Sequence, residues 1–304
     1  MSLPPPRWLN LVLFLTTLLS TFLAGALFFH AETLWEQAGN GLSFMAALMG
    51  ILVCHEAGHY VMARRNRVEV SLPFFIPMPP IFPVGTFGAL IFMRGRIRSR
   101  AALMEVGAAG PLCGMAVALP VLLVGLHSCP VGPVPAGGFM EGQSLLYAAA
   151  KWLAAGPIPP GHDVYIDRSP LVWAGWLGML VTMINLLPIG QLDGGHVAYA
   201  LFGERHRLLS RLFLGGLFVL GAGVMLRYGV GAWRAGLRGE ELVSRVLVGF
   251  NWIFWGGLLL LFRRRVLGHP PTDDQRLPPA HRAAGWLCIL LFAVTFMPYI
   301  MRPL

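Results

Sequence analysis

The segment Gly41–Arg64 reads GLSFMAALMGILVCHEAGHYVMAR. Its first thirteen residues carry no charge, which is typical of a membrane-spanning helix, yet they lead directly into His55, Glu56 and His59. Ionisable side chains inside a span are costly to bury in hydrocarbon, and by default they indicate a function with a definable partner. The segment therefore predicts a membrane protein with a chemical site inside one of its helices.

The composition of the whole chain also indicates a membrane protein. Of its 304 residues, 56% are hydrophobic and only 12% are charged, whereas a soluble domain has roughly 25% charged residues. We expect a polytopic α-helical membrane protein with about six to seven transmembrane helices. The apolar runs that predict these spans lie near residues 8–29, 41–63, 106–127, 170–189, 208–232, 246–262 and 284–301.

The net charge of +9 would suit a nucleic-acid-binding protein, but its distribution indicates membrane orientation instead. With the N-terminus on the inner side, most of the 23 Lys and Arg residues fall in inner loops, as the positive-inside rule requires. Arg234, Arg238 and Arg245 are outer exceptions, offset in part by Glu240 and Glu241. We therefore expect a multi-pass protein of the cell membrane, surrounded by the lipid bilayer and without a nucleic-acid partner.

The spacing of His55 and His59 predicts a metal site. Four residues apart on a helix, their imidazoles lie on one face, about 6 Å apart along the axis. This suits two bonds of ~2.0 Å to one Zn²⁺ ion, and Glu56 is placed as the general base of an H-E-x-x-H motif. A chance occurrence of the motif would leave three polar groups buried in hydrocarbon without a partner. We therefore predict Zn²⁺ as the cofactor.

A catalytic zinc site needs a third protein ligand and one open position. The best candidate is Asp193, because Pro188 and several glycines interrupt the helix before it, and a broken helix frees backbone groups that can line a cavity. A downstream glutamate is the alternative third ligand for an H-E-x-x-H motif. The candidates here, Glu105, Glu141 and Glu204, stand in loops or at span ends without a supporting motif.

The predicted topology brings the two motifs to one depth. The spans 41–63 and 170–189 are separated by a single span, so both run from the outer to the inner side. His55 lies about 20 Å into its span, and Asp193 lies near the inner end of the other, so both fall in the cytoplasmic half of the bilayer. We interpret His196 as a supporting residue, because a closed four-ligand site would be structural.

The two motifs together resemble a known family. His55-Glu56-x-x-His59 followed by Asn185-x-x-Pro188-x-x-x-x-Asp193-Gly194 is similar to the signature of the site-2 protease family of intramembrane zinc metalloproteases. The resemblance covers roughly residues 41–203. GTFGA at 85–89 and GAAGPLCG at 107–114 resemble the short prokaryotic members and their plastid relatives. Many members carry a PDZ or CBS domain, and neither is visible here.

The resemblance implies an intramembrane zinc metalloendopeptidase that hydrolyses peptide bonds within or near transmembrane segments of membrane protein substrates. This activity is known as regulated intramembrane proteolysis. We expect a single membrane-embedded domain over 1–304, with a catalytic core at 41–203 and C-terminal transmembrane helices at 204–304. The alternatives are a membrane metalloprotease of the prenyl-protein or heat-shock type and a non-proteolytic metal-binding protein or transporter. The intact Glu56 argues against the non-proteolytic alternatives, because they need no general base beside the ligands.

Individual roles also follow from the resemblance. It implies His55, His59 and Asp193 as zinc ligands and Glu56 as the general base. It places Asn185 near the substrate carbonyl, although a hydrogen bond to a neighbouring helix is the alternative for this amide.

The apolar segment after the second span holds five prolines between residues 73 and 83, so it is not a simple transmembrane helix. Residues 87–92 have strand-like composition, and the resembled family has a short sheet that dips into the membrane here. We expect a short re-entrant β segment that holds an unwound substrate by strand addition; a surface loop is the alternative. The predicted substrate-binding residues are Gly85, Phe87, Gly88 and Ala89.

Three glycines, Gly107, Gly110 and Gly114, follow the small-xxx-small spacing that permits close contact between membrane helices. We predict a packing role for them and no catalytic one.

Overall fold

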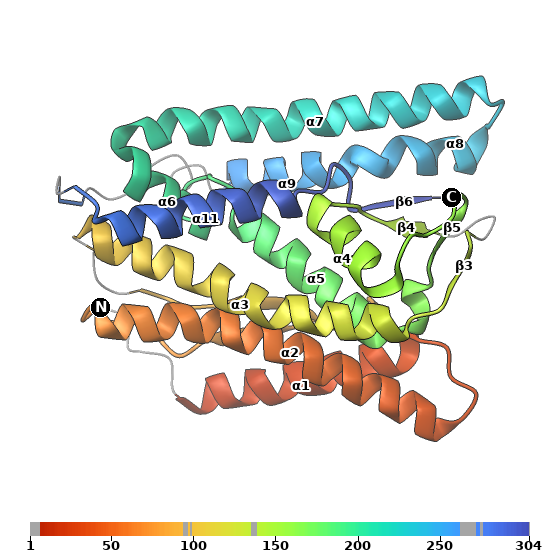
Figure 1. Ribbon diagram of the computed structural model, residues 1–304, viewed down its shortest axis with the longest axis horizontal. Helices are drawn as coiled ribbons and strands as arrows, with labels where there is room; N and C mark the ends of the chain where they lie inside the picture. The colour runs from red at the N-terminus through yellow and green to blue at the C-terminus, as the bar shows by residue number, and fades with distance from the viewer. Residues whose placement is uncertain are drawn as a thin grey trace.

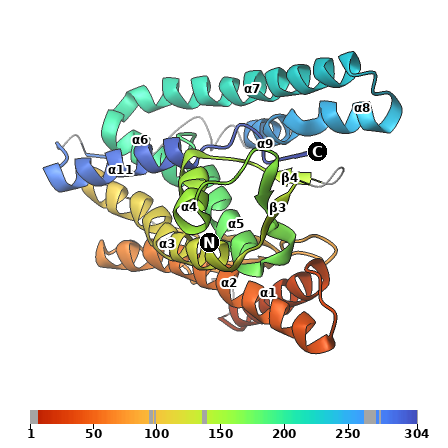
Figure 2. The same cartoon turned by 45° about the vertical axis from the view of Figure 1, so that its right-hand side comes forward.

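The computed structural model describes residues 7–93, 97, 99–134, 139–261, 272–273 and 276–303. In this part of the chain, long helices lie side by side, with α1 and α2 on one side of the molecule and α7 and α8 on the opposite side (Figure 1 and Figure 2). The prediction of a polytopic helical membrane protein is confirmed. Within the described residues, five helical stretches are long and apolar enough to cross a membrane: Trp8–Phe28, Leu34–Arg65, Arg100–Ser128, Asp193–Arg234 and Gly239–Leu261.

The helices of the described residues are α1 (Arg7–Phe28), α2 (Leu34–Arg65), α3 (Arg100–Ser128), α4 (Leu145–Ala155), α5 (Pro170–Asn185), α6 (Asp193–Phe202), α7 (His206–Arg234), α8 (Gly239–Val246), α9 (Phe250–Leu261) and α11 (Pro279–Thr295). The strands are β1 (Phe74–Pro77), β2 (Thr86–Leu90), β3 (Val131–Pro133), β4 (Phe139–Glu141), β5 (His162–Val164) and β6 (Met301–Pro303). They form three antiparallel pairs, β1 with β2, β3 with β5 and β4 with β6.

Side-chain caps set the starts of four helices. A Ser or Thr hydroxyl accepts a hydrogen bond from a backbone N–H of the first turn, a group that the helix itself leaves without a partner. The four caps are Thr33 for α2, Ser99 for α3, Ser144 for α4 and Ser169 for α5.

The helix α3 lies at the centre of the packing, against α2, α5 and α6. A Cβ added at Gly178 of α5 would lie 3.0 Å from both Ala118 and Ile51, and one at Gly175 would lie 2.7 Å from Leu122 Cβ. In lipid, helices associate through such close van der Waals packing. The two helices that carry the predicted metal ligands, α2 and α6, and the helix α5 that carries Asn185 are therefore held around a common partner.

Two predicted spans end earlier than expected. The span predicted at 170–189 stops at Asn185, and a separate helix, α6, starts at Asp193. The span predicted at 284–301 stops at Thr295, and β6 follows it to pair with β4. Both shortened helices, at 16 and 17 residues, fall below the ~20 residues that cross a bilayer upright, so the number of six to seven spans stays a prediction.

The predicted strand at 87–92 corresponds to β2, which pairs with β1 in an antiparallel hairpin. The hairpin is tied to α1, because Ser20 Oγ donates to Gly85 O at 2.7 Å and Asn10 Nδ2 donates to Pro73 O at 3.1 Å. Gly85 has φ of +72°, and a Cβ there would lie 2.6 Å from Ser20 O, so the turn requires glycine. The re-entrant depth of the hairpin stays a prediction.

Candidate metal centre

Two helices bring three candidate ligand atoms together. In α2, one helical turn separates His55 and His59, and their Nε2 atoms lie 3.2 Å apart. Asp193 is the first residue of α6, and its Oδ2 lies 3.3 Å from His55 Nε2 and 3.1 Å from His59 Nε2. Residues separated by more than 130 positions in the chain thus meet at one point.

The three distances fit a tetrahedral metal site. Ligand atoms placed ~2.0 Å from a Zn²⁺ ion in tetrahedral geometry lie ~3.3 Å from one another. The separations of 3.1, 3.2 and 3.3 Å match three corners of such a tetrahedron. Among the described residues, His55, His59 and Asp193 form the group of His, Cys, Asp or Glu whose ligand atoms converge closely enough to hold a metal ion.

A hydrogen bond orients His59 for metal binding. Its Nδ1 lies 2.7 Å from the carbonyl oxygen of Val106 in α3. Because a carbonyl only accepts, Nδ1 carries the proton, and the lone pair of Nε2 points to the other two ligand atoms. The packing of α2 on α3 therefore selects the tautomer that can bind a metal.

The glycines of α3 make room for the metal site itself. A Cβ at Gly110 would lie 2.0 Å from His59 Nε2, one at Gly114 would lie 3.1 Å from His55 Nδ1, and one at Gly107 would lie 2.8 Å from His196 Cβ. The sequence spacing predicted a close helix contact. It could not identify the partners, which are the side chains of the candidate ligands and of the neighbouring α6.

A small pocket of about 170 Å³ surrounds the three ligand atoms. Its polar lining adds Glu56, Asn185, Gln191 and His196 to them, and its apolar lining includes Ala89, Leu90, Ile91 and Met93. Glu56 is only 7% exposed. Asn185 ends α5, and its Nδ2 lies 3.3 Å from His55 Nε2. The pocket therefore combines a metal-ligand set, a buried carboxylate and a neutral amide.

The hairpin forms one wall of this pocket. In the described part of the chain, β2 pairs with β1 alone, so its other edge has no strand partner. Of the four residues predicted to bind substrate, Ala89 lines the pocket. The other three do not: Gly85 packs against α1, Phe87 is 69% exposed, and a Cβ at Gly88 would meet nothing within 4 Å. Leu90, Ile91 and Met93 line it in their place.

The three glutamates considered as alternative third ligands have other partners. Glu105 accepts from Asn66 Nδ2 at 2.7 Å and lies 2.9 Å from His281 Nε2. Glu141 pairs with Lys151, and Glu204 with Arg207. Among the described residues, Asp193 is the carboxylate that meets both histidines.

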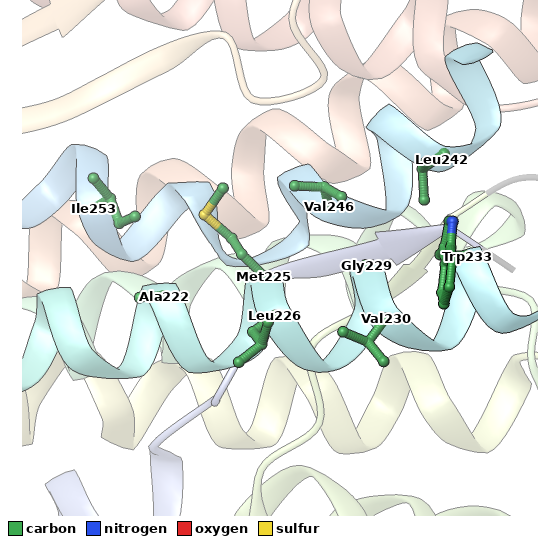
Figure 3. Close-up of a pocket in the computed structure, with 9 residues that line it drawn as sticks. All are labelled: Ala222, Met225, Leu226, Gly229, Val230, Trp233, Leu242, Val246 and Ile253. Carbon is green, nitrogen blue, oxygen red and sulfur yellow. The ribbon is translucent and has the colours of Figure 1, made fainter. Parts of the chain in front are cut away.

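A second hollow, with a volume of about 600 Å³, lies between α7, α8 and α9 (Figure 3). Nine residues line it, among them Met225, Leu226, Trp233, Val246 and Ile253, and none of the nine carries a titratable side chain. The lining residues of this groove include no metal ligand and no acid or base, and an apolar surface of this kind suits contact with lipid chains.

Comparison with known families gives a match over the region that holds these residues. Residues 43–226 match the family described as peptidase family M50. The matched region includes both histidines of α2, the hairpin, α3 and Asp193.

Three named relatives illustrate the similarity. The chain is 30% identical to the probable zinc metalloprotease EGY1, chloroplastic, of Arabidopsis thaliana over 71% of this chain and 44% of the relative. It is 29% identical to the probable zinc metalloprotease EGY2, chloroplastic, of the same plant over 87% of this chain and 43% of the relative. It is 24% identical to the putative zinc metalloprotease Rip3 of Mycobacterium tuberculosis over 88% of this chain and 59% of the relative. The chain thus spans less than half the length of both plant relatives.

Proposed function

The chain belongs to peptidase family M50, the site-2 protease family, and on this premise we propose that it is an intramembrane zinc metalloprotease. Its reaction would be the hydrolysis of peptide bonds within or near transmembrane segments of other membrane proteins. The observation that carries the proposal is the convergence of three ligand atoms, 3.1 to 3.3 Å apart, in a pocket that also contains Glu56.

His55, His59 and Asp193 would hold the zinc ion. When bound there, zinc would act as a Lewis acid that lowers the pKa of a water molecule to about 7 and favours negative charge on a carbonyl oxygen. The Val106 carbonyl keeps His59 in the required tautomer. Three protein ligands leave one position open, which separates a catalytic site from a closed structural one.

Glu56 and Asn185 would handle the proton and the developing charge. Glu56 accepts a proton from the attacking water as the oxygen adds to the carbonyl carbon of the substrate. It then delivers that proton to the amide nitrogen as the C–N bond breaks, so the enzyme ends the cycle unchanged. The amide of Asn185 donates a hydrogen bond to the substrate carbonyl oxygen as negative charge develops on it.

The substrate would bind as an extended segment along β2. A peptide bond inside a helix is enclosed by its own turn, so the segment must unwind before water can attack. The free edge of β2 offers backbone hydrogen bonds to such a segment, and Leu90, Ile91 and Met93 give the pocket an apolar wall suited to transmembrane residues. Ala89→Pro would remove a backbone donor from β2 and fix the φ angle of the strand there. We expect this variant to keep zinc and to lose cleavage.

The proposed site lies in the cytoplasmic half of the cell membrane, with residues 41–203 as the catalytic core and 204–304 as the C-terminal transmembrane part of one domain. Reconstituted vesicles would test the function. Zinc-loaded protein and a single-pass membrane protein are combined, and peptide cleavage and zinc flux are measured on the same vesicles. We expect wild-type protein to produce cleavage fragments that Glu56→Gln does not produce. Zinc flux without cleavage would contradict the proposal and identify a transporter.

A further inference from the structure

The loop between α5 and α6 has backbone groups that no regular helix satisfies. It runs over residues 186–192, and it ends where Asp193 begins α6. In an apolar interior each free N–H or C=O needs a partner. Several bond within the loop: Leu187 N donates to Ile184 O, Ile189 N to Leu187 O and Leu192 N to Ile189 O. The amide of Gly190 and the carbonyl of Pro188 instead bond to α7.

Both of these backbone groups meet the hydroxyl of Ser210. Gly190 N donates to Ser210 Oγ at 3.2 Å, and Ser210 Oγ donates to Pro188 O at 3.2 Å. His206, one turn earlier in α7, places its Nε2 3.0 Å from the same oxygen. Ser210 and His206 are both 0% exposed, so no solvent competes for these bonds.

The hydrogen-bonding capacity of a serine hydroxyl determines the direction of each bond. A hydroxyl has one proton and two lone pairs. The proton goes to Pro188 O, because a carbonyl only accepts. The two lone pairs then receive the Gly190 N–H and the N–H at His206 Nε2. The Ser210 hydroxyl therefore bonds to the Pro188 carbonyl, the Gly190 N–H and the His206 ring at the same time. This arrangement requires one tautomer of His206, with the proton on Nε2.

The backbone of this loop packs directly against the first turn of α6, so the position of the loop determines the position of that turn. A Cβ on Gly195 would lie 2.3 Å from Gly190 O, and one on Gly194 would lie 2.0 Å from Leu186 O. These two glycines directly follow Asp193. A displacement of the 188–190 turn therefore pushes on the helical turn that carries the carboxylate.

We propose that His206 and Ser210 form a positioning pair that holds Asp193 where it can bind the metal. They touch neither metal nor substrate in this role and act through the 188–190 turn. The other end of α6 is also held from outside, since Arg100 of α3 donates to the carbonyls of Ala200 and Leu201. A ten-residue helix is marginal on its own, so its orientation depends on such contacts. The inference rests on the proposed metal site.

The central test compares zinc affinity in variants that remove or keep these bonds. Ser210→Ala removes the hydroxyl without adding volume, and His206→Leu removes the N–H donor. We expect each to weaken zinc binding about 10–100-fold, the usual loss for a supporting residue of a metal site. His206→Gln keeps an N–H donor near the position of Nε2 and should restore most of the affinity. Affinity is measured by competition with a chelator on the purified full chain.

A matched control separates positioning from loss of a buried hydroxyl in general. Thr295 of α11 is also 0% exposed, and among the described residues its hydroxyl bonds to two carbonyls of its own helix alone, Leu291 O at 2.7 Å and Phe292 O at 3.3 Å. Thr295→Val should bind zinc with wild-type affinity. Substitution with Co²⁺ adds a spectroscopic readout: the visible absorption should change in Ser210→Ala and stay the same in Thr295→Val, because these bands report ligand geometry.

A measurement on unmodified protein guards against variants that fail to fold. In the metal-free wild-type chain, the Gly190 amide should be protected from hydrogen exchange, because its acceptor is a buried side chain. Exchange at the rate of an exposed loop would overturn the inference. It would also be overturned by Ser210→Ala protein with wild-type zinc affinity and Co²⁺ spectrum. Wild-type protein that binds no zinc would instead refute the proposed function, and this inference with it.

Discussion

Two buried polar clusters lie toward opposite ends of the molecule, and they differ in what completes them. The lysine cluster, built from α4, β4 and β5, consists of Lys151, Glu141, Asp163 and Tyr147. The histidine–aspartate cluster, built from α2 and α6, consists of His55, His59 and Asp193. In Figure 1, α6 and the strands β4 and β5 are well separated.

The lysine cluster contains its own cation. Lys151 Nζ lies 3.0 Å from Glu141 Oε1 and 2.6 Å from Asp163 Oδ1. Tyr147 donates to Glu141 at 3.0 Å, and burial raises the pKa of its phenol well above the usual value, so it remains a donor. Every charged group in this cluster has a partner of opposite charge, as a buried charge requires.

The histidine–aspartate cluster is arranged differently. Its three nitrogen and oxygen atoms point at one another across 3.1 to 3.3 Å, and among the described residues the ion pairs of Asp193 involve the two histidines alone. Converging lone pairs are the arrangement that a cation stabilises. Burial of charge alone therefore does not identify a metal site. A metal site is indicated where several ligand atoms converge on one point and no lysine or arginine supplies the positive charge.

The largest expected effect breaks the chemistry of the histidine–aspartate cluster without changing its ligands. Glu56→Gln should lower peptide cleavage by about 10²–10⁴-fold, because glutamine cannot accept the proton of the attacking water. Zinc content should stay near the wild-type value, since Glu56 is not a ligand in this scheme. Cleavage rates on a membrane protein substrate, with metal analysis of the same preparation, test both halves. A variant that cleaves at the wild-type rate would exclude Glu56 as the general base.

The next change removes one ligand. Wild-type protein should contain about one zinc per chain, and Asp193→Ala should lose most of it, because two histidines alone leave the site incomplete. Dialysis against a chelator followed by metal analysis measures the loss. Glu105→Ala and Glu204→Ala serve as controls. Both should keep their zinc, because Glu105 bonds to Asn66 and Glu204 pairs with Arg207. Loss of zinc in either control instead would reassign the third ligand.

The lysine cluster should respond in stability and not in metal content. Lys151→Met leaves the buried Glu141 and the partly buried Asp163 without a cation, which should cost about 3–5 kcal/mol of unfolding free energy. Zinc per folded chain should not change. Thermal unfolding in detergent measures the stability of each variant. Arg168→Met, which replaces an exposed cation in the same way, is the control. Equal stability of the two variants would show that Lys151 does not neutralise the cluster.

The smallest expected effect lies in the packing beneath the histidines. Gly110→Ala places a methyl group 2.0 Å from His59 Nε2, whereas Gly114→Ala places one 3.1 Å from His55 Nδ1. We expect zinc affinity to fall about tenfold or more in the first variant and less in the second, because displaced ligands bind more weakly. Gly223→Ala, with open space around its Cβ, is the matched control. Equal affinities in all three would show that α3 can move aside.

Much of the metal site could be predicted from short-range patterns. The i, i+4 spacing of His55 and His59 determines that both side chains leave one face of a helix, whatever the helix packs against. Pro188 cannot continue a regular helix because it lacks an N–H, so an interruption of the helix between residue 170 and Asp193 was predictable. Its division into two separate helices was not, and the predicted span at 170–189 was too long for that reason.

Local patterns in the amino-acid sequence are enough to indicate a helical membrane protein and to show which residues could bind a metal. Hydropathy and helical periodicity are local properties, written in neighbouring residues. The pairing of Asp193 with the two histidines was already expected from the two motifs and the predicted topology. The tertiary structure alone shows that Asp193 Oδ2 lies 3.3 and 3.1 Å from the two histidine nitrogens, that Gly110 leaves room for His59, and that Ser210 of α7 bonds to the loop before Asp193. These contacts join segments far apart in the chain, and they depend on how helices pack, which no local pattern contains.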